Sequence, residues 1–446
     1  FKQKTAYEIG VRLVGSEMCI RDRVIGSGGR EHALAWKLSL SDRVTEVLVA
    51  PGNAGTALEA KVRNLEVDTN DFTGLIDRAL AERVDFTLVG PEIPLVEGIV
   101  DAFQGAGLRI FGPTKKAAQL EGSKSFTKLF LDKYAIPTAE FQTFDELDSA
   151  IEYVEARGTP IVIKADGLAA GKGVVIAQTK KEAIDALKEM LSGEAFGDAG
   201  RQVVIEEFLE GEEASFICLC DGKTAISFAS SQDHKRRDEG DLGPNTGGMG
   251  AYSPAPVVDR KVHKKVMEQV ISPTLKGMIE EGSPYVGFLY AGLMIDKHGN
   301  PKVIEFNCRF GDPEAQPVMY RLRSDLLEAC EKAVSGELKD YHLEFDERVA
   351  LGVVMAAGGY PVEYETGDII EGLDVTASNT KVFHAGSIEV EGEIKTNGGR
   401  VLCVVGAGES VASAAELAYA RVNNIKWKDH YFRGDIGHRA IKRQSD

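Results

Sequence analysis

From Val24 to about Leu120, short apolar runs alternate with stretches of helical periodicity. Apolar runs separated by helices are typical of an open, parallel α/β sheet. Turn signals rich in Gly and Pro follow the runs, and ligands of such sheets bind at the carboxyl ends of the strands, so we expect these turns to share one rim. The runs are Val47-Leu48-Val49, Phe86-Thr87-Leu88-Val89 and Leu108-Arg109-Ile110-Phe111; one helical pattern covers Glu31 to Leu38; the turns are Pro51-Gly52-Asn53, Gly90-Pro91-Glu92 and Gly112-Pro113-Thr114.

A second unit begins with a helical pattern near Lys124, and apolar strands flank a glycine-rich loop within it. Beyond Ala214 strands come first and helices later, and from Ala350 the chain is rich in strands. This order predicts an α/β and α+β multidomain protein. We expect an N-terminal open parallel α/β sheet over 24–123 that binds a substrate phosphate, a central domain over 124–345 with a lid subdomain at about 140–210, and a C-terminal strand-rich domain over 346–446.

Residues 1–23 do not read as part of this fold. They lack the apolar segment of a secretory signal. Three charged residues, Arg21, Asp22 and Arg23, precede the strand end Val24-Ile25-Gly26, where a central parallel strand should continue as an apolar run. We therefore expect a leader that is disordered or non-native, in the second case replacing a short native start. A genuine flexible extension is the alternative.

Composition narrows the classes of function. The 446 residues include 52 basic and 69 acidic ones, which gives a formal charge of −17. This acid excess argues against nucleic acid as the main partner, because binding phosphate backbones needs a basic face. No stretch approaches the roughly 18 to 20 uncharged apolar residues that a membrane span requires. The six cysteines form no pair or cluster at metal-ligand spacing, so a reduced, cytoplasmic compartment fits best.

The loop Gly26-Ser27-Gly28-Gly29-Arg30-Glu31-His32 closes a strand and opens a helix. Glycines there let the backbone approach an anion, and the helix N-terminus offers unpaired N–H groups to a phosphate. A dinucleotide site is a second interpretation, but Glu31 stands in place of the third glycine of G-x-G-x-x-G, and no ribose-binding acid ends Val49-Ala50-Pro51. A tight packing turn is the third interpretation. The residues favour a phosphate loop.

A second glycine-rich loop, Gly167-Leu168-Ala169-Ala170-Gly171-Lys172-Gly173, departs from a Walker loop because one residue is missing and Gly173 replaces Ser or Thr. A strand rather than a helix follows, which predicts a flexible hairpin flap over phosphates. Lys164 projects from the strand below, and a buried Lys needs a counter-charge, for which nucleotide phosphate is the natural candidate. Lys124, in Gly122-Ser123-Lys124-Ser125, supplies a second basic group. A surface hairpin with a solvated Lys is the alternative.

Carboxylates gather at two strand ends. The strand Val203-Val204-Ile205 runs into Glu206, Glu207 and further acids, where an extended backbone can pair with an adenine edge and a carboxylate can take ribose hydroxyls. In Lys302-Val303-Ile304-Glu305-Phe306-Asn307 the period of two places Glu305 and Asn307 on one face. Two hard oxygen ligands suit Mg²⁺ or Mn²⁺ held together with triphosphate oxygens. A solvated acidic strand end and an Asp-Pro turn on an edge strand are the bland alternatives.

One long polar segment, from Ser231 to Pro254, interrupts the central domain. It contains Asp233-His234-Lys235-Arg236 and Asn245-Thr246-Gly247-Gly248-Met249-Gly250. A polar segment of this length inside a compact domain is usually functional or disordered. We favour a substrate role for the segment, although a lone His234 is more often a satisfied structural residue than a ligand.

Taken together and in this order, the motifs resemble the ATP-grasp superfamily, and within it the phosphoribosylamine–glycine ligases (glycinamide ribonucleotide synthetases) of purine biosynthesis. The resemblance runs from Val24 to the end of the chain. Its most specific element is Arg309-Phe310-Gly311-Asp312-Pro313-Glu314-Ala315-Gln316, and it is supported by Gly28-Gly29-Arg30-Glu31-His32, Pro51-Gly52-Asn53-Ala54-Gly55, the stretch from Lys164 to Gly173, Gln232-Asp233-His234-Lys235-Arg236 and Asn245-Thr246-Gly247-Gly248-Met249-Gly250.

The resemblance implies a central ATP-grasp fold and a role for each matching residue. ATP phosphates would contact Lys124 and Lys164, with Gly167, Gly171, Lys172 and Gly173 in the flap. Adenine would be read by Glu206 and the backbone through Glu207 to Leu209, and the ribose by Glu213. Glu305 and Asn307 would hold the metal, and a further metal carboxylate often found twelve residues earlier is replaced by Leu293. The amine-phosphate substrate would lie between Gly28-Gly29-Arg30 and the central domain, and Asp233, Asn245, Gly248, Arg309 and Asp312 would line the glycine region, with Arg309 and Asp312 also catalytic.

The implied reaction is ATP-dependent ligation of glycine to 5-phosphoribosylamine through glycyl phosphate, which gives glycinamide ribonucleotide, ADP and phosphate. The implied partners are these small molecules, ATP and Mg²⁺ or Mn²⁺, with no nucleic acid or membrane; a monomer is our interpretation of the assembly. Three alternatives stay open: another ATP-grasp enzyme such as a carboxylase or dipeptide-type ligase, an NAD-dependent dehydrogenase built on the first glycine loop, and a catalytically dead nucleotide sensor.

Overall fold

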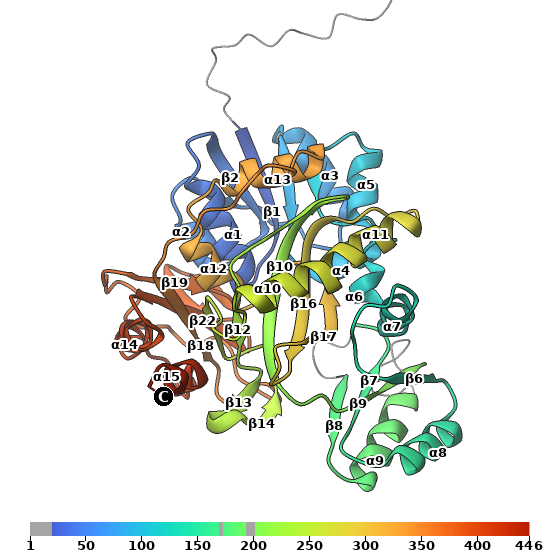
Figure 1. The fold of residues 1–446 in the computed structure, drawn as a ribbon. Helices are drawn as coiled ribbons and strands as arrows, with labels where there is room; N and C mark the ends of the chain where they lie inside the picture. Colours follow the sequence, from blue (N-terminus) through green and yellow to red (C-terminus); the bar gives the residue numbers. More distant parts are fainter. Residues whose placement is uncertain (1–19, 169–172, 193–200, 446) are drawn as a thin grey trace, which may run out of the picture.

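The computed structural model describes residues 20–168, 173–192 and 201–445 (Figure 1). Its N-terminal unit is a five-stranded sheet of order β3-β2-β1-β4-β5 in which every neighbouring pair is parallel. The predicted open parallel α/β sheet is therefore confirmed. The elements are β1 (Ile20–Gly26), α1 (Gly29–Ser39), β2 (Val44–Pro51), α2 (Ala54–Leu58), β3 (Val62–Asn64), α3 (Phe72–Ala81), β4 (Phe86–Val89), α4 (Glu92–Glu97), α5 (Ile99–Gly105) and β5 (Ile110–Phe111).

Strand β1 begins at Ile20, four residues before the expected start of the fold at Val24. Residues 20–23 thus belong to the sheet rather than to a leader, and Asp22 and Arg23 are fully buried within it. The side chains alternate: Val24 packs into the core on one face and Ile25 into the core on the other. The sequence analysis excluded these residues because it required an apolar run, whereas β1 pairs with both β2 and β4 through the charged residues Asp22 and Arg23.

The central unit is built on a four-stranded antiparallel sheet of order β11-β10-β16-β17. Its strand β17 carries Glu305 and Asn307 toward its C-terminal end, while Lys302 near its start pairs with Glu207 on β9 of the lid subdomain. The elements are α6 (Gln119–Gly122), α7 (Lys124–Lys133), β10 (Glu212–Asp221), β11 (Ala225–Ser227), α10 (Arg260–Val266), η3 (Met267–Ile271), α11 (Ser272–Glu280), β16 (Val286–Ile295), β17 (Pro301–Asn307), α12 (Ala315–Arg321) and α13 (Leu326–Ser335).

A separate antiparallel sheet of order β6-β9-β7-β8 projects from the central unit (Figure 1) and has its own hydrophobic core. Strands β7 and β8 pair as a hairpin with Lys164 opposite Val174, which confirms that a strand follows the second glycine-rich loop. This sheet carries Lys164, on β7, which is one of the ATP-phosphate residues identified in the sequence. Its elements are β6 (Phe141–Phe144), α8 (Leu147–Arg157), β7 (Ile161–Ala165), β8 (Val174–Ala177), α9 (Lys180–Leu191) and β9 (Val203–Glu207).

The C-terminal sheet has the order β12-β15-β18-β22-β19, and two of its strands come from the polar segment of the central domain. That segment is therefore ordered, and its strands β12 and β15 are part of the C-terminal sheet. The strand-rich C-terminal domain is confirmed, with strands drawn from outside its expected range. The elements are β12 (Gln232–Asp233), β13 (Arg236–Asp238), η2 (Glu239–Asp241), β14 (Leu242–Asn245), β15 (Gly250–Ser253), β18 (Val349–Ala356), β19 (Thr380–His384), β20 (Ser387–Val390), β21 (Glu393–Thr396), β22 (Arg400–Gly408), α14 (Val411–Val422) and α15 (His438–Ser445).

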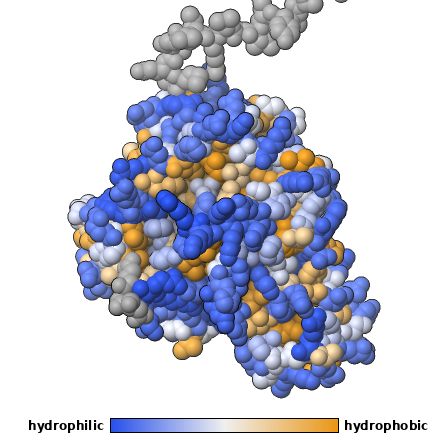
Figure 2. All heavy atoms as spheres, viewed as in Figure 1, coloured by the Kyte–Doolittle hydropathy of each residue, from blue (hydrophilic) through white to orange (hydrophobic). Residues whose placement is uncertain are grey.

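Hydrophilic residues cover most of the face in Figure 2, and hydrophobic residues gather there in smaller groups between them. Within the described ranges, no helix combines the length and the apolar character that crossing a membrane requires.

Candidate active site

Three lysines from different parts of the chain face the carboxylate of Glu305. Burial works to raise the pKa of this carboxyl group, but the charges of Lys235, Lys164 and Lys124 outweigh it and hold the pKa at about 2. Lys235 Nζ lies 3.6 Å from Glu305 Oε1. Asn307, two residues along the same face of β17, is 8% exposed. The arrangement supplies an ionised carboxylate and an amide beside a concentration of positive charge.

Lys164 has its counter-charge within the protein. Its Nζ lies 2.8 Å from Oε1 of Glu206 on the adjacent strand β9, and Lys128 Nζ lies 3.0 Å from Oε2 of the same carboxylate. The sequence suggested nucleotide phosphate as the partner of Lys164, and the fold places the carboxylate of Glu206 beside it. Since both oxygens of Glu206 face lysines, any contact of this residue with adenine falls to its backbone. Lys128 was not singled out from the sequence, although it lies one helical turn after Lys124.

Lys124 begins helix α7 and is tied to the start of the flap. Its Nζ donates to the carbonyl oxygen of Gly167 at 2.8 Å, while its backbone N–H donates to Asp166 O at 3.0 Å. On the other side of the flap, the carbonyl of Gly173 accepts from Ala165 N at 2.9 Å. The remaining flap residues of the predicted ATP site, Gly171 and Lys172, lie outside the described residues.

The other acids expected around the nucleotide are ion-paired. Glu207 lies 2.8 Å from Lys302 Nζ, and Glu213 lies 3.0 Å from Lys235 Nζ. Lys235 thus stands between Glu213 and Glu305, which connects the expected ribose position to the expected metal position. Leu209 follows β9 in an irregular stretch. The sequence signal for Lys235 was its place in the Asp233-His234-Lys235-Arg236 motif, which did not single out the lysine.

The first glycine loop is capped by its own chain. The N–H of Gly28 donates to Glu31 Oε2 at 2.6 Å, so this donor is already satisfied by a carboxylate. Arg30 turns away from the loop: its Nε lies 2.5 Å from Glu31 Oε1 and its Nη1 donates to Phe310 O at 3.2 Å. A Cβ on Gly29 would lie 2.5 Å from Gln316 Nε2, so a larger residue there would displace the side-chain amide of Gln316.

Arg309 is held in a buried chain of alternating charges. Its Nε lies 3.3 Å from Glu92 Oε2 and its Nη2 lies 3.0 Å from Glu121 Oε1. Glu121 also accepts the N–H of Cys308 at 2.7 Å, directly after Asn307. Burial opposes the charge on Arg309, yet Glu121 and then Glu92 outweigh it and raise its pKa. Through these contacts, Arg309 and Glu121 connect the N-terminal unit to the C-terminal end of β17.

The polar segment and the Asp-Pro turn meet. Gly248 adopts φ +109, and a Cβ there would lie 2.6 Å from Asp233 Oδ1 and 2.4 Å from Pro313 Cδ. Burial raises the pKa of Asp233 well above its usual value. Asp312, just before Pro313, accepts from Gln316 Nε2 at 2.8 Å. Asn245 ends β14 and pairs with Arg236 of β13, in the same hairpin. Of the four residues expected around glycine here, the structure thus brings Asp233, Gly248 and Asp312 together, whereas Asn245 belongs to this hairpin.

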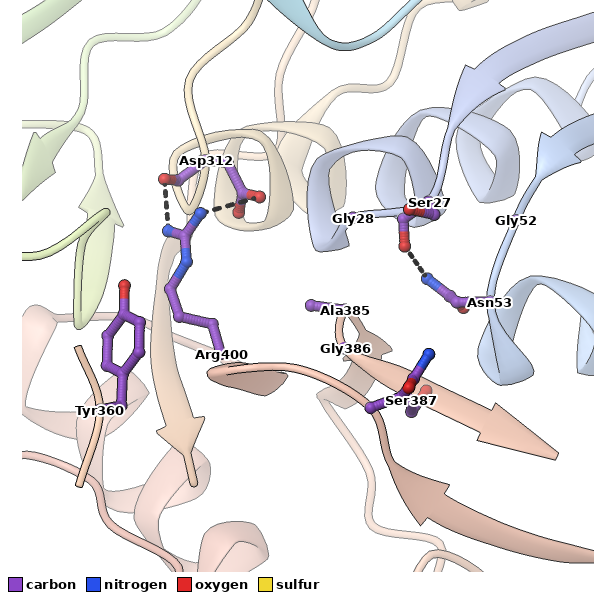
Figure 3. A pocket seen from close by; sticks show the side chains of 11 residues that line it. Ser27, Gly28, Gly52, Asn53, Asp312, Tyr360, Ala385, Gly386, Ser387 and Arg400 are labelled. Atoms are coloured by element: carbon purple, nitrogen blue, oxygen red, sulfur yellow. Dashed lines mark hydrogen bonds and ion pairs between the residues drawn. The ribbon is translucent and has the colours of Figure 1, made fainter. Parts of the chain in front are cut away.

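A cavity of about 250 Å³ opens where these parts meet (Figure 3). It lies at the carboxyl ends of β1 and β2, where ligands of open α/β sheets bind. One wall comes from the C-terminal unit, which the sequence analysis did not assign to the site. The lining residues are Ser27, Gly28, Gly52, Asn53, Asp312, Tyr360, Ala385, Gly386, Ser387, Asn397 and Arg400.

The side chains around Glu305 suit a metal ion that is bound together with phosphate. Among the described residues, no group of three or more His, Cys, Asp or Glu side chains is placed to hold an ion. Mg²⁺ bound with a triphosphate needs only one or two carboxylates, because water and phosphate oxygens complete its shell. The ionised carboxylate of Glu305 with the oxygen of Asn307 fits that need, and Leu293, twelve residues before Glu305, is fully buried and supplies no ligand.

Family models match most of the chain. The model described as phosphoribosylglycinamide synthetase, ATP-grasp (A) domain, matches residues 122–315, the N-domain model of the same family matches 22–121, and the C-domain model matches 350–439.

Individual proteins match over nearly the full length. A phosphoribosylamine–glycine ligase of Escherichia coli O6:H1 is 60% identical over 425 residues, which cover 95% of this chain and 99% of that one. The crystal structure of phosphoribosylamine–glycine ligase from Thermotoga maritima has a TM-score of 0.82 at 34% identity and covers 94% of this chain and 100% of that one. The biotin carboxylase domain of Hydrogenobacter thermophilus 2-oxoglutarate carboxylase, solved with MgADP, is similar in fold alone: TM-score 0.73 at 16% identity, covering 93% of this chain and 92% of that one.

Proposed function

The chain belongs to the phosphoribosylglycinamide synthetase family, and from this premise we propose how it performs the reaction of that family. It is an ATP-dependent carbon–nitrogen ligase that joins glycine to 5-phosphoribosylamine and gives glycinamide ribonucleotide, ADP and phosphate. The resemblance drawn from the sequence motifs is thereby confirmed. How the individual residues divide the work is our proposal.

ATP lies between the lid sheet and the central sheet. Lys124 and Lys164 contact its phosphates, Lys235 approaches them from the polar segment, and Glu213 takes the ribose hydroxyls. The convergence of these lysines on Glu305 supports this assignment, because four negative phosphate charges need a positive surround. Glu305 and Asn307 would hold Mg²⁺, with Mn²⁺ as the alternative ion, and the bound ion would neutralise charge on the phosphoryl oxygens.

Glycine lies beside Asp233, Gly248 and Asp312, and phosphoribosylamine occupies the cavity of Figure 3. The N-terminus of α1 faces that cavity through Ser27 and Gly28 and offers partial positive charge to the ribose phosphate. The carboxylate of glycine attacks the γ-phosphorus in line, and the amine then attacks the carbonyl carbon of glycyl phosphate and expels inorganic phosphate. Arg309 and Arg30 hold the surrounding turns together through their carboxylate partners.

Acyl phosphates hydrolyse, so the site must exclude water during the reaction. In this proposal the lid sheet over about 140–210 covers the nucleotide during the reaction. We propose the division into units at 24–123, 124–345 and 346–446, with β1 extended back to Ile20 and with β12 and β15 lent to the C-terminal sheet. We propose a monomer as the functional unit, because every residue assigned to this site comes from one chain.

The observation that carries the proposal is that two lysines from distant segments meet at β17: Lys235 Nζ lies 3.6 Å from Glu305 Oε1, and Lys164 Nζ donates to Ile304 O at 3.0 Å. The test measures ADP release with a panel of acids and amines, including bicarbonate, D-alanine and ribosylamine, which lacks the phosphate. We expect turnover only when glycine and phosphoribosylamine are both present. Turnover with bicarbonate, or tight NAD binding without ATP binding, would contradict the proposal.

A further inference from the structure

The side chain of Arg400, in the C-terminal unit, contacts the turn that contains Asp312. It is the first residue of β22, and its side chain extends between the Gly247 loop and the Asp312 turn. Nη1 donates to Gly247 O at 2.5 Å and to Asp312 O at 2.7 Å, and Nη2 lies 3.3 Å from Asp312 Oδ2. One guanidinium therefore fixes both the backbone and the carboxylate of Asp312 (Figure 3).

Asp312 is the single carboxylate among the described residues that line the cavity. The other lining residues are glycine, alanine, serine, asparagine, tyrosine and Arg400 itself, and none of these is an anionic base near neutral pH. The side chain of Asp312 is 16% exposed, so an occupant of the cavity can reach its carboxylate.

Other cations near Asp312 are already neutralised. Arg30 is paired with Glu31, and Arg309 is paired with Glu92 and Glu121. Burial works to raise the pKa of Asp312, but Arg400 and then Arg30 outweigh it and lower the pKa, so the carboxylate is ionised. Arg400 is thus the cation in direct contact with one oxygen of this carboxylate, and the other oxygen accepts from Gln316 Nε2 at 2.8 Å.

The ligation step needs a proton acceptor at this place. The nitrogen lone pair of the amine forms the new bond to the carbonyl carbon of glycyl phosphate. The bond from that carbon to the phosphate oxygen breaks, inorganic phosphate leaves with the electron pair, and the nitrogen must release one proton.

We propose that the carboxylate of Asp312 accepts this proton and that Arg400 is the positioning residue that holds Asp312 toward the cavity. The C-terminal unit thereby supplies part of the ligation machinery while standing apart from the ATP-binding lysines. This assignment rests on the proposed function, because it concerns the amine substrate of that same site.

The test separates phosphoryl transfer from ligation. Glycyl phosphate formation is followed as glycine hydroxamate, with hydroxylamine as the nucleophile and ribose 5-phosphate present to fill the cavity. Ligation is followed with phosphoribosylamine formed from ribose 5-phosphate and ammonia. Hydroxylamine also releases one proton from its nitrogen, but as a small nucleophile that enters from solution it passes that proton to water or buffer, so hydroxamate formation does not require an acceptor in the protein.

We expect D312N and R400M to lower kcat for ligation by about 100-fold or more, the lower end of what general base catalysis contributes. Hydroxamate formation at saturating glycine falls at least tenfold less than ligation, and the KM for ATP stays close to that of the unchanged protein. R400K keeps the charge but loses the second nitrogen donor, so it restores part of the ligation rate. The control is K428M, which alters an exposed lysine on the same unit, 62% exposed and paired with Glu365.

Equal loss of both reactions in D312N and R400M would overturn the assignment, since it would place the two residues in phosphoryl transfer or in folding. Unchanged ligation in either variant would overturn it as well. If R400M fails to fold, D312N preserves the side-chain volume and decides the question. An unchanged chain that forms hydroxamate but does not ligate phosphoribosylamine would instead refute the proposed amine substrate.

Discussion

The ammonium group of Lys164 lies 2.8 Å from the carboxylate of Glu206, and the second oxygen of that carboxylate lies 3.0 Å from Lys128. Each of the three side chains is at most 5% exposed. One buried carboxylate therefore pairs with two buried ammonium groups, and the net positive charge that remains can be balanced by a phosphate. Burial lowers the pKa of Lys128 to about 8, although Glu206 opposes that shift.

Replacing Glu206 with Gln should destabilise the chain strongly. The change leaves Lys164 and Lys128 buried without an anionic partner, and removing one member of a buried pair costs about 3–5 kcal/mol. The free energy of unfolding in urea measures the effect. E207Q is the matched control, because its partner Lys302 is 44% exposed and an exposed pair contributes at most about 1 kcal/mol. Similar losses in the two variants would show that Glu206 is not the central anion.

Replacing Asp22 with Asn should stabilise the chain most at high pH. Burial, followed by Glu331 and Asp85, raises the pKa of Asp22 from 3.8 to about 8. The unfolded chain releases this proton near pH 4 and the folded chain only near pH 8, so rising pH removes stability across that window. Within the described part of the chain, neither carboxylate oxygen of Asp22 has a hydrogen-bond partner.

The measurement for Asp22 is the urea midpoint at pH 5 and at pH 8. We expect the unchanged protein to lose more stability between these values than D22N does. D77N, at an exposed position of α3, is the control and should follow the unchanged protein. Parallel pH profiles of D22N and the unchanged protein would mean that Asp22 is hydrated or paired when folded.

Replacing Gly248 with Ala should damage activity beyond the cost of backbone strain. Both Gly248 and Gly240 have positive φ, +109 and +68, so alanine is disfavoured at either by roughly 1 kcal/mol. A Cβ at 248 also meets Asp233 and Pro313, whereas a Cβ at 240 has no atom within 4 Å. Steady-state kinetics should show a tenfold or greater fall in kcat/KM for G248A, about 1.4 kcal/mol or more at the transition state. A similar fall in G240A would assign the loss to strain alone.

Replacing Lys235 with Met should slow the reaction with little effect on folding. Burial works to lower the pKa of Lys235, but Glu213 and Glu305 outweigh it and raise the pKa well above its usual value, so the side chain is a permanent cation. Loss of one such stabilising group costs about 100- to 1,000-fold in kcat. K181M, at an 86% exposed position of α9, is the control for kcat. A rate for K235M within twofold of the control would remove Lys235 from the phosphate site.

Local features of the site could be predicted from the sequence because they follow from short-range geometry. Glu305 and Asn307 share a face since strand side chains alternate, whatever the rest of the chain does. The hairpin around the glycine-rich flap and the parallel N-terminal sheet follow equally from apolar runs and turn residues. Motif order then indicated the family, which the comparisons confirm.

The partners of the charged groups were decided only by the tertiary structure. Glu206 reaches Lys164 because β9 pairs with β7, and Arg400 reaches Asp312 because β12 and β15 join the C-terminal sheet. Arg30 and Arg309 look in the sequence like anion-binding residues, yet Arg30 pairs with its neighbour Glu31, and packing between units brings Glu92 and Glu121 to Arg309. A local pattern fixes which way a side chain points along its own strand or helix. The residue it meets there depends on sheet register and on the packing of segments hundreds of residues apart, and no local pattern carries that information.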